Sequence, residues 1–443
     1  MQIRKKWLYT ILIIVIIILV QIINPFADQF SLFQANYSAG KKPLYDINEL
    51  AERPFLMGMN PHPRQFGKEN LTQEEINENI NEAYELGKTS MELYPRWPDI
   101  NWYEASSKMP ADHFQLYKTQ FGWLPMVYIK TVDYYLSEGV WHTKPLLSPT
   151  QSPDLKFNDS EFIQDVSDEL IAFCSQEPGP DVVFLGNEIN QIYELEDNQT
   201  FMEYTESMKQ ITQNIRAAPT VSEKVKIGIV LSYTQMLVNI SNWEPWEEDR
   251  LWMLEKFSGA NGVDIFGINS YPFKNNFNNP EDIPADYYTQ IEDYTDKPIW
   301  FTEISWPSGA EMNSTEEEQS KFLTHFVDIT STMTIEAICW ISMHDFVNSS
   351  QYSGHQLSWE LRDKDSNPKE VWSDWMALIA LEVTGPMEAY LPTATTPPPS
   401  SNNTTNPLAM KFGMVFMGGI ASLICVTVSI MMRSKRRKKR TTT

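Results

Sequence analysis

Two glutamates in this chain each end a short apolar run, and their setting suits a specific acid–base chemistry. Glu188 follows the run at residues 182–187, and Glu303 follows the run at residues 298–302. Each run has the length and composition of a buried parallel strand that presents a carboxylate at its C-terminal end. Two carboxylates that face one cleft are the minimum equipment for cleaving a glycosidic bond through a covalent intermediate, if they lie about 5–5.5 Å apart.

The two carboxylates have different tasks in that chemistry. We expect Glu303 to be the nucleophile at the anomeric carbon, and Glu188 to protonate the leaving oxygen and then to activate water. Glu188 must hold its proton near neutral pH, which requires partial burial or the nearby charge of Glu303. Asn187 can hydrogen-bond a sugar 2-hydroxyl, a contact that strengthens in the transition state. Its simpler interpretation is a turn residue.

Two further side chains at predicted strand ends could hold Glu303 ionised and correctly turned. Tyr271 stands before Pro272 at the end of one apolar run, and Arg96 follows another. A phenol and a guanidinium both donate hydrogen bonds to a carboxylate. The alternatives are ordinary packing for Tyr271 and a bridge to surface carboxylates for Arg96.

Aromatic and basic side chains near the same strand ends could contact sugar. Trp306 and Trp340 offer flat apolar faces for sugar rings, or else they cap the core of the domain. His344 is a candidate for sugar contact, as are His62 and Lys130, although such residues are more often ordinary loop residues.

The elements that must position these residues repeat along the chain. Short apolar runs alternate with amphipathic stretches that have helical periodicity. Eight such units in about 330 residues favour an α/β fold, a (β/α)8 TIM barrel, in which the chemistry lies at the C-terminal strand ends. A doubly wound open sheet is the alternative, but no Gly-rich phosphate loop follows the first strand. The predicted strands are 55–59, 90–94, 123–128, 182–187, 225–230, 263–268, 299–303 and 337–341.

Residues 50–385 resemble glycoside hydrolases of clan A, which are retaining TIM-barrel enzymes. The resemblance rests on Asn187-Glu188 ending the fourth strand and Glu303 ending the seventh. Residues 299–310 are similar to the nucleophile segment of endo-1,3-β-glucanases, with Ser305 where those have Gly. The run 267–272 resembles β-1,4-galactanases, and 361–369 followed by Trp372 resembles the closing loop of cellulase-like members. The resemblance implies hydrolysis of a β-linked glycan.

Both ends of the chain are apolar and basic. Residues 7–23 predict a signal-anchor, with a cleaved signal peptide as the alternative, and 412–432 are long enough to span a bilayer. Basic residues flank both spans, which places the termini 1–6 and 433–443 in the cytoplasm and the rest outside the cell. Between the spans we expect a stalk (24–50), the barrel (51–385) and a Pro/Thr/Ser-rich linker (386–407).

The charge balance limits the partners. The whole chain carries −23, and the two ends hold 11 of the 35 Lys and Arg, so the part between them has 24 basic and 58 acidic residues, or −34. Such a surface repels nucleic acid, and we read the basic tail as a stop-transfer signal rather than a nucleic-acid site. Nine Asn-x-Ser/Thr sequons favour a glycosylated surface protein. No Cys/His pattern indicates zinc, and we expect no cofactor.

The sequence therefore predicts a membrane-tethered, extracellular, retaining β-glycosidase that acts on an oligo- or polysaccharide. One alternative is a non-catalytic carbohydrate-binding or structural surface protein on a hydrolase-like barrel, which needs only the aromatic faces. Another is a transglycosylase that remodels glycans and uses the same residues. Sugar, linkage, internal or terminal cleavage and oligomeric state stay open.

Overall fold

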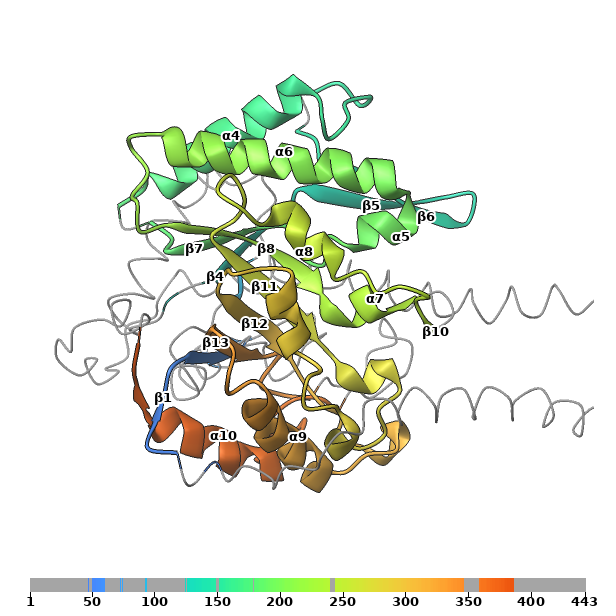
Figure 1. Cartoon of the computed structure of the whole chain (residues 1–443), viewed down its shortest axis with the longest axis vertical. Coiled ribbons are helices and arrows are strands. Elements are labelled where there is room, and N and C mark those ends of the chain that lie inside the picture. The colour runs from blue at the N-terminus through green and yellow to red at the C-terminus, as the bar shows by residue number, and fades with distance from the viewer. Residues whose placement is uncertain are drawn as a thin grey trace, which may run out of the picture. The chain divides into compact units, whose positions relative to one another are not determined.

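Figure 1 shows a computed structural model of the chain. The structure describes residues 47, 50–59, 72, 74, 92–93, 124, 126–148, 151–177, 179–239, 244–345 and 358–385. The chain divides into two compact units, Met1–Tyr45 and Asp46–Thr443, and every described residue belongs to the second. The predicted spans 7–23 and 412–432, the linker and the basic tail lie outside the described residues. Within the described part, no helix combines the length and apolarity needed to cross a bilayer.

An eight-stranded parallel sheet forms the centre of the second unit. From β3 to β13 its spatial order follows the chain, and β13 also pairs with β2, so the first strand lies beside the last, as in a (β/α)8 barrel. Every strand of this sheet overlaps one of the eight predicted from the sequence, which confirms the predicted strands. In spatial order they are β2 (Leu56–Met59), β13 (Ile335–Trp340), β12 (Ile299–Ile304), β11 (Ile265–Ser270), β8 (Lys226–Ser232), β7 (Val182–Leu185), β4 (Met126–Ile129) and β3 (Glu92–Leu93).

The sheet curves around its own core. The sulfur of Cys339 in β13 lies 3.7 Å from the sulfur of Met126 in β4, although β12, β11, β8 and β7 lie between these strands in the sheet. Five strand spacings in a flat sheet would separate the two side chains by about 24 Å. This contact argues against the flat, doubly wound alternative and is consistent with a TIM barrel.

Aromatic side chains fill the space inside the curve. Phe184 of β7 stacks on Tyr128 of β4 at 5.3 Å between ring centroids and meets the edge of Trp300 of β12 at 6.0 Å. Gly228 of β8 makes room for this ring, because a Cβ atom there would lie 2.6 Å from Phe184. These contacts join the neighbouring strands β4 and β7 to the more distant β12 in one buried cluster.

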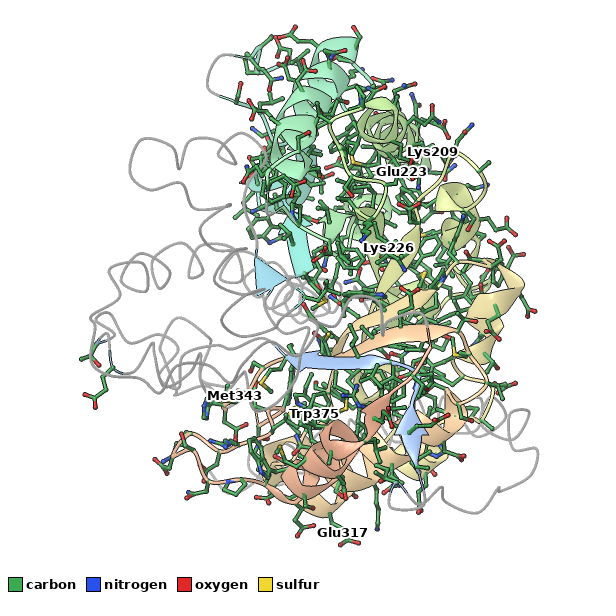
Figure 2. All side chains as sticks on the ribbon, turned by 90° about the vertical axis from the view of Figure 1, so that its left-hand side faces the viewer. Lys209, Glu223, Lys226, Glu317, Met343 and Trp375 are labelled. Carbon is green, nitrogen blue, oxygen red and sulfur yellow. The ribbon has the colours of Figure 1, made fainter. Side chains whose placement is uncertain are left out.

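A half-buried ion pair joins two strands near their N-terminal ends. Lys226 (labelled in Figure 2) begins β8, and its Nζ lies 2.7 Å from both carboxylate oxygens of Glu336 in β13. The indole nitrogen of Trp300 donates to the same carboxylate at 3.0 Å. The carboxylate is thus satisfied at the end of the sheet opposite to the predicted site.

Helices flank the sheet in two groups. In Figure 1, α4 (Ser160–Cys174) and α6 (Asn198–Ala217) run side by side on one flank, and α9 (Glu316–Ile329) and α10 (Glu370–Ala380) pack together on another. A capping box of Thr315 and Glu318 begins α9. The shorter helices are α5 (Gln191–Leu195), α7 (Tyr233–Leu237), α8 (Trp252–Phe257) and the 3₁₀ turns η5 (Pro272–Asn275), η6 (Pro280–Asp282), η7 (Thr289–Asp293) and η8 (Ala310–Met312).

Three small two-stranded sheets complete the described part. The segment after β4 contains a hairpin of β5 (Val132–Ser137) and β6 (Val140–Pro145), which Figure 1 shows extending away from the sheet. Its two-residue turn has positive φ at both positions, Glu138 and Gly139, as a type I′ turn requires. The other pairs are β1 (Glu52–Arg53) with β14 (Glu382–Val383) and β9 (Val238–Asn239) with β10 (Glu244–Pro245).

Candidate active site

The C-terminal ends of β7, β11 and β12 bring the predicted acidic residues to one edge of the sheet. Glu188 comes three residues after the end of β7, and Glu303 is the last residue but one of β12. Their exposed fractions are 6% and 7%, so neither carboxylate is turned out to bulk solvent. Burial of both side chains at the edge where barrel enzymes hold their chemistry makes them the centre of the candidate site.

Asn269 of β11 connects the two strand ends. Its Nδ2 donates to Asn187 Oδ1 at 3.1 Å and, more weakly, to Glu188 Oε1 at 3.4 Å. Its Oδ1 accepts a hydrogen bond from Thr302 at 2.8 Å, and Asn269 is the register partner of Glu303 in the β11–β12 ladder. This fully buried amide therefore fixes the acid strand relative to the nucleophile strand.

Glu303 is held by the phenol of Tyr271. The Tyr271 hydroxyl donates a short hydrogen bond to Glu303 Oε2, and both side chains are buried. Tyr271 directly follows β11, which lies next to β12, so the two side chains meet across adjacent strands. The contact is the one that the sequence analysis assigned to Tyr271.

Glu188 lies in a different environment. Burial raises the pKa of its carboxyl group, while the charge of Lys274 and hydrogen bonds from Asn269, Gln191 and Ser232 act in the opposite direction. Gln191 Nε2 donates to Glu188 Oε2 at 2.8 Å. A raised pKa is what a proton donor near neutral pH requires.

The backbone at Glu188 is held in an unusual conformation. Glu188 has φ +50° and Gly186 has φ +102°, both in the region that disfavours side chains. At Gly186, a Cβ atom would also lie 2.6 Å from the Tyr204 hydroxyl. The chain bends directly after β7, and the Glu188 side chain is buried there; strained backbone of this kind is common at functional sites.

Asn187 keeps a donor available beside the acid. Its Oδ1 accepts from Asn269, but its buried Nδ2 has no hydrogen-bond partner among the described residues. Buried amide donors normally have a partner. The geometry fits the predicted contact with a sugar hydroxyl.

Lys274 was not identified from the sequence. It lies three residues beyond Tyr271, and its Nζ is 4.1 Å from the centre of the Tyr271 ring and 5.0 Å from that of Trp359. The charges of Glu188 and Glu303 both favour its protonated form, although burial is the larger effect and lowers its pKa. Lys274 thus places a cation within electrostatic reach of both carboxylates.

Trp359 is a second residue that sequence reasoning missed. Its ring is partly exposed and lies 5.9 Å from Tyr271. Its backbone oxygen accepts from Trp340 Nε1 at 2.8 Å, and its backbone nitrogen donates to Glu360 at 2.8 Å. Burial, and next the charge of Asp345, raise the pKa of Glu360. The hydrogen bonds to the buried side chains of Trp340 and Glu360 hold the Trp359 backbone, and with it the ring.

The remaining predicted residues have different positions. Trp340 and Trp306 have exposed fractions of 0% and 1%; Trp306 stacks on Phe322, and these contacts favour packing over sugar binding. His344 is buried, with Nδ1 3.4 Å from the Ser366 hydroxyl. Arg96 lies outside the described residues, as does His62.

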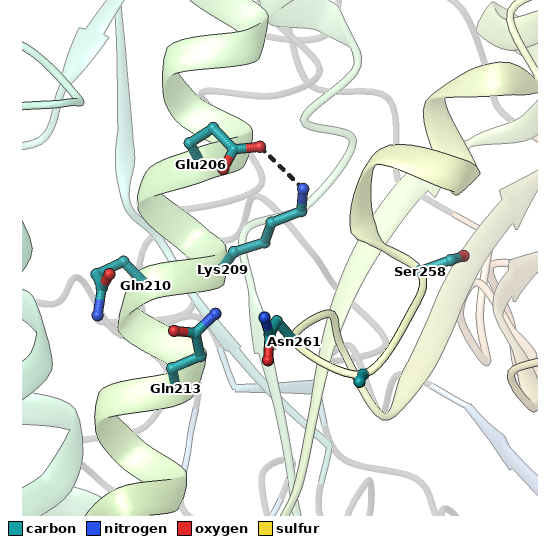
Figure 3. A pocket seen from close by; sticks show the side chains of 7 residues that line it. Glu206, Lys209, Gln210, Gln213, Ser258 and Asn261 are labelled. Atoms are coloured by element: carbon teal, nitrogen blue, oxygen red, sulfur yellow. Dashed lines mark hydrogen bonds and ion pairs between the residues drawn. The ribbon is translucent and has the colours of Figure 1, made fainter.

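A polar hollow lies apart from this site. A shallow polar hollow between α6 and the turn after α8 (Figure 3) lies on the helix side, and none of the candidate residues lines it; its lining includes Glu206, Lys209, Gln210, Gln213, Ser258 and Asn261. In the part of the chain that the structure describes, no cluster of His, Cys, Asp and Glu could hold a metal ion.

No protein-family model matches the chain, and no curated protein sequence matches it significantly. Solved structures do match. A GH5_18 variant from Streptomyces cattleya, in complex with Manβ1-4GlcNAc, has a TM-score of 0.51 at 12% identity over 73% of this chain and 80% of that one. GH5_18 from Bifidobacterium longum subsp. longum ATCC 55813 gives 0.51 at 14% identity over 86% and 96%. An exo-β-1,4-mannosidase from Opitutaceae bacterium strain TAV5 gives 0.50 at 14% identity over 77% and 62%.

At these identities the likeness shows the fold. The chain has an α/β fold like that of retaining barrel glycoside hydrolases of clan A. The resemblance inferred from Asn187-Glu188 and Glu303 is confirmed at that level.

Proposed function

We propose that this chain is a retaining β-glycosidase with Glu303 as nucleophile and Glu188 as acid and base. The observation that carries the proposal is the contrast between two buried carboxylates at one sheet edge. Glu303 receives a hydrogen bond from the Tyr271 phenol, whereas burial favours the protonated form of Glu188. Environments that separate two carboxyl groups in this way assign one to attack and the other to proton donation.

The proposed reaction has two steps. In the first, a Glu303 oxygen bonds to the anomeric carbon while the glycosidic C–O bond breaks, and the Glu188 proton passes to the leaving oxygen. In the second, Glu188 takes a proton from water, whose oxygen displaces Glu303 and gives the free sugar with the original configuration. Asn187 Nδ2, which has no hydrogen-bond partner within the described part of the chain, donates to the sugar 2-hydroxyl in both steps.

Paired variants test the proposal. The purified protein is first assayed with 4-nitrophenyl β-glycosides of glucose, mannose, galactose and xylose and with the corresponding β-1,4-linked tetrasaccharides. On the best substrate, Glu303→Ala should lower the rate by several orders of magnitude, and Glu188→Gln should lower tetrasaccharide cleavage roughly a hundredfold to ten-thousandfold. Glu206→Gln, an exposed carboxylate on α6, is the matched control and should keep the wild-type rate.

Added azide distinguishes the two roles. Glu303→Ala leaves space for azide to attack the anomeric carbon directly, so the product should be a glycosyl azide of inverted configuration. Wild-type rates in both variants would refute the proposal. Tight oligosaccharide binding without any cleavage would support the non-catalytic alternative, and transfer to a sugar in preference to water would support the transglycosylase.

The proposal also covers the rest of the chain. Pairing of β3 with β2 closes the barrel. The apolar segments 7–23 and 412–432 tether the barrel outside the cell, with both termini in the cytoplasm. Support comes from the flanking basic residues and the sequons. Retention of the full-length protein in membranes after alkaline extraction, together with a mobility shift on removal of N-glycans, is the expected result; release into the soluble fraction would contradict it.

A further inference from the structure

The β5–β6 hairpin is fixed beside the proposed acid. At its base, Thr131 Oγ1 lies 2.9 Å from the Tyr204 hydroxyl, which donates to the Leu185 carbonyl at 2.8 Å, just before Glu188. Further out, Glu196 directly after α5 accepts a hydrogen bond from the backbone nitrogen of Thr143. The hairpin is therefore attached on both sides of the segment that carries Glu188.

The register of the hairpin separates its two faces. Tyr134 pairs with Thr143 and Leu136 pairs with Trp141, so Tyr134, Leu136 and Trp141 share one face. Tyr135 pairs with His142 on the other face, where the two rings stack at 5.5 Å. We call the face with Tyr134 and Trp141 the aromatic face.

The aromatic face has three buried polar atoms without a hydrogen-bond partner among the described residues. They are the Tyr134 hydroxyl, the Trp141 indole nitrogen and the hydroxyl of Thr143, the register partner of Tyr134. Buried Tyr and Trp polar groups usually find a partner. Tyr134 also lies within electrostatic reach of Glu188, and burial is the main reason that its pKa is raised. One row further out, Leu136 is 54% exposed.

We propose that the aromatic face binds the leaving-group half of the substrate, and that this half is itself an uncharged saccharide. The inference rests on the proposed function, because an acid at Glu188 protonates the leaving oxygen and the leaving group therefore lies on the side of Glu188. The Trp141 ring packs against the C–H face of a pyranose, and its N–H and the Tyr134 hydroxyl bond to sugar hydroxyls. The strongly acidic surface of the chain disfavours an anionic leaving group.

Two substrates of one sugar test the inference. A 4-nitrophenyl glycoside has a leaving group too small to cover the aromatic face, whereas a β-1,4-linked tetrasaccharide has one that can. Trp141→Ala should lower kcat/KM for the tetrasaccharide roughly tenfold or more, and it should leave kcat/KM for the aryl glycoside within about twofold of wild type. Trp141→Phe, which keeps the ring and loses the N–H, should give a smaller loss.

The matched control is Tyr135→Ala on the opposite face, which should behave as wild type with both substrates. Retained aryl-glycoside cleavage in Trp141→Ala shows that the hairpin base and Glu188 are intact. Equal losses on both substrates, no loss on the tetrasaccharide, or a wild-type protein that cleaves only aryl glycosides would overturn the inference while leaving the proposed function standing. A wild-type protein that cleaves nothing would refute both.

Discussion

The hydrogen bond from Tyr271 to Glu303 gives the most direct test of the site. Tyr271→Phe removes the phenol oxygen and keeps the ring that packs against Trp359 and Lys274. A hydrogen bond to a charged group contributes about 1.5–3 kcal/mol. If the bond orients the nucleophile, its loss should lower kcat/KM for an activated aryl glycoside roughly tenfold to 150-fold.

Tyr287→Phe is the control for this measurement. Tyr287 belongs to a buried aromatic group, stacking edge-on with Tyr288 at 4.8 Å, and its hydroxyl has no hydrogen-bond partner among the described residues. Removing that hydroxyl should leave kcat/KM unchanged. A comparable loss in Tyr287→Phe would show that any cavity near β11 lowers activity, and it would refute the reasoning for Tyr271.

Stability gives an independent measure of the same bond. Tyr271→Phe leaves Glu303 with one donor fewer in a buried position, so it should destabilise the wild-type protein more than it destabilises a Glu303→Gln background. Urea unfolding of the four proteins gives the coupling free energy, which we expect to be about 1–2 kcal/mol. A coupling near zero would mean that the phenol and the carboxylate do not act as a pair.

Other predictions concern the turn after β7 and the buried charges. Because the pKa of Glu188 is raised in the folded state, its contribution to stability is full below about pH 4.3 and is lost as pH rises through the folded pKa. Urea midpoints across this range should fall less in Glu188→Gln than in wild type, and parallel curves would contradict this. Gly186→Ala places a Cβ atom at a residue with positive φ and against the Tyr204 hydroxyl. It should lower the free energy of unfolding in urea by about 1–3 kcal/mol. Lys369→Met removes the buried cation that pairs with half-buried Asp345, and we expect a loss of about 1–3 kcal/mol by the same method; Lys364→Met, an exposed cation in the same loop, should change little.

The sequence allowed the strands and the two acidic residues to be predicted for one physical reason. Buried parallel strands need continuous apolar runs, so each strand is visible in the sequence, and the residue that follows it must lie at the sheet edge. Glu188, Glu303 and Tyr271 were found in this way. Contacts across neighbouring strands, such as the Asn269 bridge, need the register, which an apolar run does not specify.

Residues on loops were less predictable. Trp359 reaches Tyr271 and Lys274 from far along the chain, and its position depends on Glu360 and its buried neighbours. No local sequence pattern predicts such a long-range contact. Trp306 and Trp340 show the opposite case, because a tryptophan beside a strand end has the same sequence signature whether it packs inward or meets a ligand.

The pairing of the first strands with the last has a consequence for synthesis of the protein. β2 pairs with β13, and β1 pairs with β14, whose residues lie near the end of the described part. A chain emerging from the ribosome cannot complete either ladder until these late residues are available, so the early strands keep an open edge while most of the sheet is translated. Contacts of such large sequence separation also form slowly. This architecture therefore favours chaperone protection of the nascent chain, and truncations before β13 should accumulate as aggregates rather than as smaller folded proteins.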